Sequence, residues 1–339
     1  MTKLRINLAL QGGGAHGAFT WGVLDRLLQE DDLEIAAIAG TSAGALNAAA
    51  LKSGMLGGGH EGGRAALDAL WAEVAHNSSA GMSQWFAQDL FSPSIMSKAL
   101  ELSPMYAFAD AINRMTSPYA SGPFYNHPLQ SIVDCLDYGD VCAPEGPDLF
   151  IGATNVRSGK VKVFKDAEIG PNALLASACL PTLFRAVEID GEAYWDGGYT
   201  GNPPLFPLFE RQYPEDILII NINPLERAEV PQTAQAIQNR INEIGFNTSL
   251  LRELRAISFV QRLISDGTMD GGAMKRVHVH MIADDALMNE LSVATKTVAI
   301  PSVLNALKQA GQAAASAFLE THRNDVGKRS SVDLQAMFS

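Results

Sequence analysis

Ser42 stands in the pattern Gly40-x-Ser42-x-Gly44, which suits nucleophilic attack on a carbonyl carbon. The pattern follows an apolar run over 35–39 that predicts a buried strand, and it precedes an Ala/Leu-rich run that predicts a helix. In this context the two glycines permit a sharp strand-to-helix turn that projects the Ser42 hydroxyl above the sheet edge. An ordinary helix cap is the alternative, because Thr41 and Ser42 are both good N-cap residues. The match on both sides favours the nucleophile elbow.

A second glycine-rich turn, Gly12-x-Gly14-x-x-Gly17, follows an apolar run over 4–10 and precedes a helical pattern. Formally this is a dinucleotide-binding fingerprint, which requires an acidic residue at the end of the second strand to hold the ribose hydroxyls. The elbow occupies that place, and Glu34 lies at the wrong end of the strand. Three consecutive glycines also leave backbone N–H groups free to converge on an anion. The pattern therefore favours an oxyanion hole over a nucleotide site.

A serine nucleophile needs a base, and the sequence offers two kinds. His278 and His280 share one strand face, where a structural pair is favoured over a triad histidine. Asp196 precedes two glycines, at a tight turn where partial desolvation would raise its proton affinity. Taken alone, this motif slightly favours an ordinary Asp-Gly turn.

The elements that must position these residues follow from periodicity and turn signals. Strands are expected over 4–10, 35–39, 148–154, 160–164, 217–222 and 277–282, and a hairpin over 185–195. Helices are expected over 18–29, 43–52, 64–76, 171–179, 234–264 and 302–319. The strand–helix–strand–helix opening implies parallel strands with right-handed crossovers.

Two segments differ in texture from the rest. The segment 54–63 contains six glycines and is expected to be a flexible connector. The segment 77–128 is poor in charge and rich in Ser, Pro, Met and aromatic residues. We expect short helices there, packed as a cap, with a satellite core as the alternative.

The composition bounds the function. A chain of 339 residues is long enough for one α/β domain with insertions or for two smaller domains. With 47% apolar and 18% charged residues, global disorder is excluded. The net charge of −12 argues against binding to nucleic acid. It also weakens electrostatic docking on anionic lipid, but leaves apolar docking open.

The cysteines and the apolar runs bear on location. Cys135, Cys142 and Cys179 have no metal-ligand spacing and leave one unpaired if two were bridged. They therefore predict a reducing compartment, with thiols as small core residues. The N-terminus has no signal-peptide pattern, and the small-apolar region 35–51 carries too many polar residues and glycines to span a membrane. A cytoplasmic protein is expected, with transient membrane-surface contact and homo-oligomer formation both left open.

Four ordered blocks together resemble the patatin-like phospholipases, and Asn202-Pro203-Pro204 after the last block is also typical of that family. The blocks are Gln11-Gly12-Gly13-Gly14-Ala15-His16-Gly17, Gly40-Thr41-Ser42-Ala43-Gly44, the stretch 176–184, and Asp196-Gly197-Gly198. The resemblance covers 6–208 and says nothing about 209–339.

The resemblance implies an α/β fold of three layers, α/β/α, patatin-like (lysophospholipase-like), with a mostly parallel central sheet and a helical cap insertion. The expected division is a catalytic domain over 6–208 that includes the cap over 77–128. A C-terminal extension over 209–322 is expected to add strands and helices to the same globule. A polar tail over 323–339 is expected to fray.

The resemblance also implies a Ser–Asp dyad without histidine, in which Ser42 is the nucleophile and Asp196 is the base. It assigns the oxyanion-hole amides to Gly12, Gly13 and Gly14, and turn support to Gly40, Gly44, Gly197 and Gly198. The implied substrate is a lipid or acyl ester, and neither calcium, another metal nor a cofactor is implied. The family commonly has Arg or Lys where His16 stands, which would make anion affinity there depend on pH.

The function expected from these residues is serine lipid acyl hydrolysis of phospholipase or lysophospholipase type. Acyl transfer is one alternative, since an acyl-serine can react with an alcohol or thiol instead of water. Malonyl-transferases of related architecture carry a histidine beside the elbow serine, whereas Thr41 and Ala43 flank Ser42. A catalytically silent lipid-binding protein is the other alternative, disfavoured because every expected catalytic position is filled.

Overall fold

The computed structural model describes residues 4–82, 93–101, 103, 116–227, 229–269, 274–292 and 294–339. Within these residues, eight strands form one sheet in the order β5-β6-β3-β2-β1-β7-β8, with β4 also paired to β3. The strands are β1 (Leu4–Leu10), β2 (Leu33–Thr41), β3 (Asp148–Asn155), β4 (Val161–Lys165), β5 (Val187–Ile189), β6 (Glu192–Asp196), β7 (Asp216–Ile220) and β8 (His278–Ile282).

The sheet is mostly parallel. β1 pairs in parallel with β2 and β7, β2 with β3, and β7 with β8. The antiparallel pairs are β3 with β4, β3 with β6, and β5 with β6. This arrangement confirms the predicted fold class. β7 and β8 come from the region after residue 208 and continue the sheet directly from β1.

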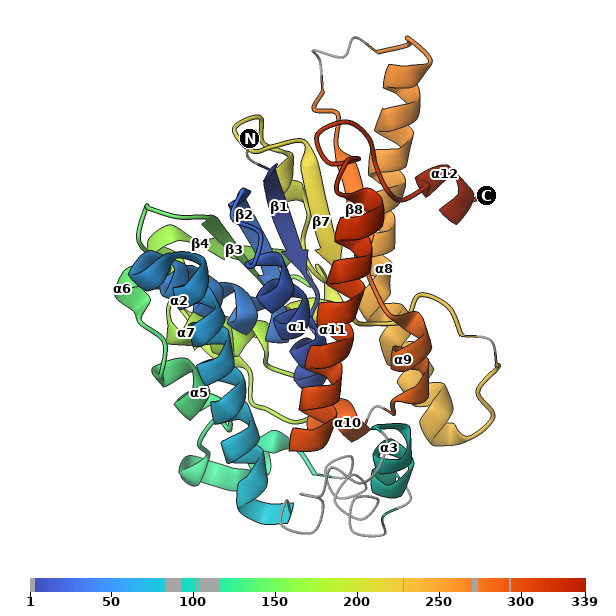
Figure 1. Cartoon of the computed structure of the whole chain (residues 1–339). Coiled ribbons are helices and arrows are strands. Elements are labelled where there is room, and N and C mark those ends of the chain that lie inside the picture. Colours follow the sequence, from blue (N-terminus) through green and yellow to red (C-terminus); the bar gives the residue numbers. More distant parts are fainter. Residues whose placement is uncertain are drawn as a thin grey trace.

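Helices cover both faces of the sheet (Figure 1). α1 (Gly17–Leu27), α2 (Ala43–Met82) and α11 (Pro301–His322) lie on one face, and α8 (Ala234–Ser265) lies on the other. The shorter helices are α3 (Pro93–Glu101), α5 (Gln130–Asp134), α6 (Tyr138–Val141), α7 (Pro171–Ser177), α9 (Asp285–Glu290), α10 (Ala294–Thr297) and α12 (Leu334–Met337). The result is a three-layer α/β/α arrangement.

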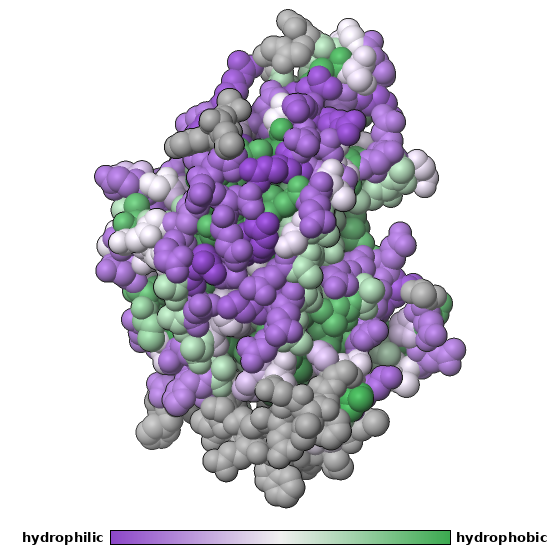
Figure 2. Space-filling model, in the orientation of Figure 1, coloured by the Kyte–Doolittle hydropathy of each residue, from purple (hydrophilic) through white to green (hydrophobic). Residues whose placement is uncertain are grey.

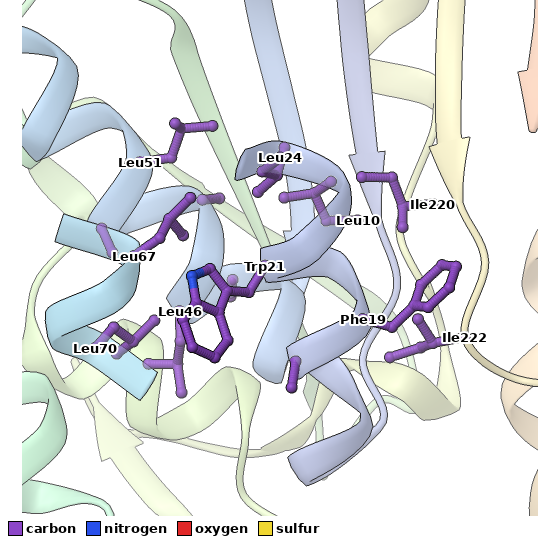
Figure 3. Packing of buried hydrophobic residues seen from close by; sticks show 14 of the residues in the cluster. Leu10, Phe19, Trp21, Leu24, Leu46, Leu51, Leu67, Leu70, Ile220 and Ile222 are labelled. Atoms are coloured by element: carbon purple, nitrogen blue, oxygen red, sulfur yellow. The ribbon is translucent and has the colours of Figure 1, made fainter. Parts of the chain in front are cut away.

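The side-chain alternation of β1 builds two separate cores. Leu8 and Leu10 point to the face covered by α1, where Leu10 lies among Leu24, Phe19 and Ile220 (Figure 3). Ala9 points the other way and packs in the cluster that α8 closes. Because both faces of the central strands are buried, β1 is apolar over its last three residues and β7 over its last four, as expected for a parallel sheet.

α1 and α11 cross at very close range. A Cβ atom on Gly22 would lie 1.9 Å from the backbone oxygen of Lys308, and one on Gly311 would lie 2.1 Å from the oxygen of Phe19. Both neighbours are backbone atoms, so neither can swing away. The helix contact therefore depends on the absence of side chains at these two positions.

The segment 54–63 is not the flexible connector that its six glycines predict. α2 runs through it, with non-helical backbone only at Gly58 and Gly59 (φ +62°), where the chain reverses. A Cβ on Gly54 would lie 2.3 Å from the Gly62 oxygen, so the glycines let two antiparallel helical arms touch. Composition was misleading here because close helix packing and chain flexibility both select glycine.

Much of the expected cap over 77–128 lies outside the described residues, including the stretches 83–92 and 104–115. Within the described part, Met96 and Leu100 of α3 are buried in the main core. Arg185 fixes the chain at the other end of this region. Its guanidinium donates to the carbonyls of Pro118, Tyr119 and Gly122.

The tail over 323–339 is ordered against the body rather than frayed. Arg323 forms ion pairs with Glu30 and Asp32, and the Ser331 N–H donates to the carbonyl of Val279 on β8 at 3.1 Å. Leu334 is buried in the core beneath α8. The tail is polar in composition, but ion pairs and one buried leucine hold it.

The three cysteines are free thiols. Cys179 is buried and Cys142 is half-buried, and each thiol donates to a backbone carbonyl at 2.9 Å. Cys135 is exposed, so the expectation that all three act as core residues was wrong for this one.

Within the described ranges, every helix is either too short or too polar to cross a bilayer. Hydrophilic residues cover much of the face drawn in Figure 2, and hydrophobic residues appear there in smaller patches. Acidic residues outnumber basic ones on the chain as a whole, which gives the strong net negative charge.

We expect Gly22→Ala to destabilise the fold by about 1–3 kcal/mol, because the added methyl group must push two helix backbones apart. The control is Gly57→Ala, at an exposed helical position where an added Cβ meets nothing within 4 Å. That change should leave stability unchanged or raise it by up to about 1 kcal/mol through helix propensity. Denaturant unfolding of both variants is the measurement, and equal effects would contradict the packing account.

Candidate functional site

Ser42 lies in a strained turn between β2 and α2. Its φ is +55°, which is unusual for a residue other than glycine. The Ser42 carbonyl accepts the Ala45 and Leu46 N–H groups, so the residue stands at the N-terminus of α2. A Cβ on Gly44 would lie 2.2 Å from the Leu10 oxygen, so this glycine lets the turn pass over the end of β1. The sharp strand-to-helix turn predicted from the sequence is therefore present at Ser42.

The Ser42 backbone is held by a neighbouring serine. The Ser42 N–H donates to the Ser177 hydroxyl at 2.9 Å, and that hydroxyl donates to the Gly152 carbonyl at 2.6 Å. Ser177 is completely buried at the end of α7. The hydrogen-bonded chain from β3 through α7 to the elbow helps hold the turn in its strained conformation.

The glycine loop after β1 is in direct contact with the elbow. A Cβ on Gly12 would lie 2.7 Å from the Ser42 Cβ and 2.8 Å from the Thr41 oxygen. Any side chain at this position would therefore displace the serine. Gly14 has a φ of +59°, and the 3₁₀ helix η1 (Gly14–His16) follows at once.

The three loop amides are not equivalent. The Gly12 N–H donates to the Asn202 side-chain oxygen at 2.7 Å, so it is already occupied. Over the described residues, the Gly13 and Gly14 N–H groups have no acceptor. Only these two of the three predicted amides are free to bind an anion, and Gly12 instead provides the close approach to Ser42.

Asp196 ends β6 and caps the following 3₁₀ helix η5 (Gly197–Tyr199). Its carboxylate accepts the Gly198 N–H at 2.7 Å, and it lies close enough to the Ser42 hydroxyl for that hydroxyl to lower its pKa. Its backbone is fixed on both sides, because the Asp196 N–H donates to the Cys179 carbonyl and the Thr154 hydroxyl donates to the Asp196 carbonyl. The motif is therefore more than an ordinary Asp-Gly turn.

Burial raises the pKa of Asp196 to about 7, and the hydrogen bonds from Gly198 and Ser42 act in the opposite direction. The carboxyl is only 2% exposed. A buried carboxylate that ionises near neutral pH is a much stronger proton acceptor than an exposed aspartate. The site thus joins a strained serine to an unusually basic carboxylate.

His16, where the family commonly has Arg or Lys, is buried and uncharged. Its Nε2 lies 2.8 Å from the Thr295 hydroxyl, which itself donates to the Ser292 carbonyl, so Nε2 carries the proton. Burial and the charges of Lys296 and Arg227 hold the pKa of His16 well below its usual value. The expected pH-dependence of anion affinity therefore cannot come from His16 near neutral pH.

The geometry weighs against a triad histidine. A Cβ on Gly14 would lie 2.2 Å from the Lys296 backbone oxygen, so α10 packs directly on the glycine loop. His278 and Asp216 are the first residues of β8 and β7, and the His280 Nε2 lies 2.9 Å from the Asp216 carboxylate. These strands run parallel to β2, so the histidines lie toward the opposite edge of the sheet from Ser42.

Sequence reasoning missed several residues that hold this site. Asn202 and Ser177 stood in the family-like blocks, but without an assigned function. Asn223 donates to the Gly12 carbonyl at 2.8 Å, and Lys296 donates to Asn223 at 2.9 Å. The one available signal was Asn221 and Asn223, which come directly after an apolar strand, since such positions lie at the sheet edge that carries the elbow.

The family model described as patatin-like phospholipase matches residues 8–209. The comparison with curated proteins finds no match. The crystal structure of VipD from Legionella pneumophila is similar at 17% identity and a TM-score of 0.45, over 94% of this chain and 67% of that chain.

The type III effector ExoU is similar at 15% identity and a TM-score of 0.34. The complex of ExoU with SpcU from Pseudomonas aeruginosa gives 15% identity and a TM-score of 0.32. Each match covers 94% of this chain, and this chain spans about half the length of ExoU, 53% and 54%.

We expect Asp196→Asn to stabilise the folded protein at pH 8. The raised pKa of Asp196 means that the folded state favours the protonated acid, so wild-type stability is lost as pH rises from about 4 through about 7. An amide has no charge to desolvate. The stability gain should be about 2 kcal/mol larger at pH 8 than at pH 5, by denaturant unfolding. A gain independent of pH would contradict the buried, shifted carboxyl.

Proposed function

The chain belongs to the patatin-like phospholipase family, and on that basis we propose that it is a serine lipid acyl hydrolase acting on phospholipids or lysophospholipids. One observation carries the proposal: the buried Asp196 carboxylate interacts with the Ser42 hydroxyl, and the strained turn of Ser42 touches a loop with two free amides. A nucleophile, a base and an anion-binding loop are the three groups that ester cleavage requires.

In the first half-reaction, the Ser42 oxygen attacks the ester carbonyl carbon while the Asp196 carboxylate takes the hydroxyl proton. The carbonyl oxygen becomes an oxyanion, which the Gly13 and Gly14 N–H groups bind. The intermediate then expels the alcohol, to which Asp196 returns the proton, and an acyl-serine remains. Loss of one such amide donor typically costs about 10²–10³-fold in rate.

In the second half-reaction, a water molecule attacks the acyl carbon and gives a proton to Asp196. The second tetrahedral intermediate uses the same two amides. Its collapse breaks the bond to the Ser42 oxygen, which recovers the proton from Asp196, and a fatty acid is released. One carboxyl group therefore acts as base and acid in turn, without histidine.

The environment of Asp196 supports this assignment. An ordinary carboxylate is a poor base toward a hydroxyl, because its proton affinity is low. Burial raises the pKa of Asp196 to about 7, which brings it closer to the much higher pKa of a serine hydroxyl. The N-terminus of α2 adds a positive dipole end beside Ser42, which favours its developing negative charge.

Partners and location are inferred from the same activity. A lipid hydrolase must reach substrate in an aggregate or bilayer, so we infer transient contact with a membrane surface. Free thiols at all three cysteines support a reducing, cytoplasmic location. The assembly state is left to measurement of the mass in solution.

We expect Ser42→Ala and Asp196→Asn each to lower the rate of hydrolysis of short p-nitrophenyl esters by about 10⁴-fold or more, because each removes a group that reacts in both half-reactions. Asp190→Asn is the matched control, since Asp190 also precedes a glycine in a turn but is exposed. It should keep full activity.

Circular dichroism should show that all three variants stay folded. Full activity in Asp196→Asn, together with its loss in His280→Gln, would replace the dyad by a triad. Product analysis with an added alcohol separates hydrolysis from acyl transfer.

We expect kcat/KM to rise with pH through an apparent pKa of about 7. Only the ionised carboxylate of Asp196 accepts the serine proton, so activity is lost as pH falls through that value. A pH–rate profile on a neutral ester measures this limb. A rising limb near pH 4 would show that Asp196 titrates as an ordinary aspartate.

A further inference from the structure

The orientation of one peptide unit decides where the Gly13 N–H points. The carbonyl of this unit belongs to Gly12 and accepts from the Asn223 side-chain amide at 2.8 Å. In a trans peptide the N–H and the C=O point in opposite directions. The Gly13 N–H therefore points away from Asn223. Asn223 therefore helps to aim this donor, together with the Asn202 amide, which donates to the same carbonyl at the longer distance of 3.4 Å.

Asn223 is fully buried and has each of its side-chain groups engaged. Its nitrogen donates to the Gly12 carbonyl and to the Gln11 side-chain oxygen at 3.1 Å. Its oxygen accepts from the Lys296 ammonium at 2.9 Å. This charged donor fixes which end of the amide faces the loop, because an ammonium cannot accept a hydrogen bond.

Lys296 reaches the glycine loop through its backbone and, by way of Asn223, through its side chain. Its backbone oxygen packs on Gly14, at 2.2 Å from where a Cβ would stand. Its side chain reaches Asn223. Residues 223 and 296 both lie outside the segment 8–209 that matches the family model. The C-terminal part of the chain thus closes over the loop and contributes a positive charge there.

We propose that Lys296 is a positioning residue for the hydrolytic reaction, which acts through Asn223 and the Gly12 carbonyl to orient and polarise the Gly13 N–H. This inference rests on the proposed function. Hydrogen bonds that share a peptide group strengthen one another, and a charge at the start of the chain increases the effect. The stabilisation that the Gly13 N–H gives is largest when negative charge develops on the substrate oxygen. Loss of this stabilisation should therefore lower kcat rather than raise KM.

Charged and titratable groups near Lys296 come from three segments. They are His16 on η1, Arg227 in the loop after β7, and Glu243 with its partner Arg240 on α8. The exposed Lys98 lies on α3, which packs against α10. Arg227 forms a bidentate ion pair with the buried Glu243, at 2.6 and 3.1 Å, and Arg240 also donates to Glu243. His16 is neutral near pH 7. Lys296 is thus the cation that hydrogen-bonds to Asn223.

Burial lowers the pKa of Lys296 to about 8, with a further decrease from Arg227 and an opposing increase from Glu243. The ammonium, and with it the fixed orientation of Asn223, is lost as pH rises above that value. The wild-type rate should therefore fall on the alkaline side. An arginine at 296 would keep its charge over the whole range.

The experiment compares wild type, Lys296→Met, Lys296→Arg and Lys275→Met on a p-nitrophenyl ester from pH 6 to 10, with Ser42→Ala as the baseline. Lys275 is the matched control, because burial also lowers its pKa to about 8 while its ammonium donates to the Leu208 and Glu210 carbonyls, away from the loop. Lys296→Met should lower kcat about 10–100-fold with little change in KM. Lys296→Arg should restore kcat and remove the fall above pH 8, and Lys275→Met should match wild type.

A double-mutant cycle completes the test. Asn223→Ala should cost about as much as Lys296→Met, and the two together should cost little more than either one. Full kcat in folded Lys296→Met, or an alkaline fall that persists in Lys296→Arg, would overturn the inference while leaving the hydrolase assignment intact. Absence of any hydrolysis above the Ser42→Ala baseline in wild type would overturn both.

Discussion

Burial of Asp196 disfavours the charged form of its carboxyl group, whereas the Gly198 N–H and the Ser42 hydroxyl favour that form. The balance leaves the pKa near 7 rather than near 4, so the group changes charge in the range where cells operate. The Thr154 hydroxyl, the Cys179 carbonyl and the end of β6 keep this carboxyl in its dry position. Burial of this carboxyl costs stability at and above neutral pH, and in the proposed mechanism the same burial makes a weak base a stronger one.

The parallel sheet explains how distant segments reach the same place. The glycine loop follows β1, Ser42 follows β2 and the stretch 221–223 follows β7, and parallel strands end at one edge. Glycines then let the segments touch, most closely where Gly12 meets Ser42. Side-chain amides from Asn202 and Asn223 hold the loop from two sides. The C-terminal third is therefore part of the environment of the site.

The sequence predicted the parallel sheet and the sharp turn at Ser42, because sharp turns and buried strands leave local patterns. For Asp196 the local motif alone favoured an ordinary Asp-Gly turn, and its role as the base was implied by the resemblance and stays a proposal. The sequence did not predict which amides are free, since the bond from Gly12 to Asn202 joins residues 190 positions apart. The contact of Lys296 with Asn223 was also missed, because it joins residues 73 positions apart and a lysine in a short helix has no local signature. The glycines over 54–63 were misread because composition does not separate tight packing from flexibility.

A crystal structure of the protein after reaction with a fluorophosphonate tests the central claim most directly. The phosphonyl group imitates the tetrahedral intermediate of ester cleavage. We predict a covalent bond to the Ser42 oxygen, with the phosphonyl oxygen about 2.7–3.1 Å from the Gly13 and Gly14 nitrogens and Asp196 alongside. An unmodified Ser42, or an adduct whose oxygen points to solvent with both amides empty, would contradict the account.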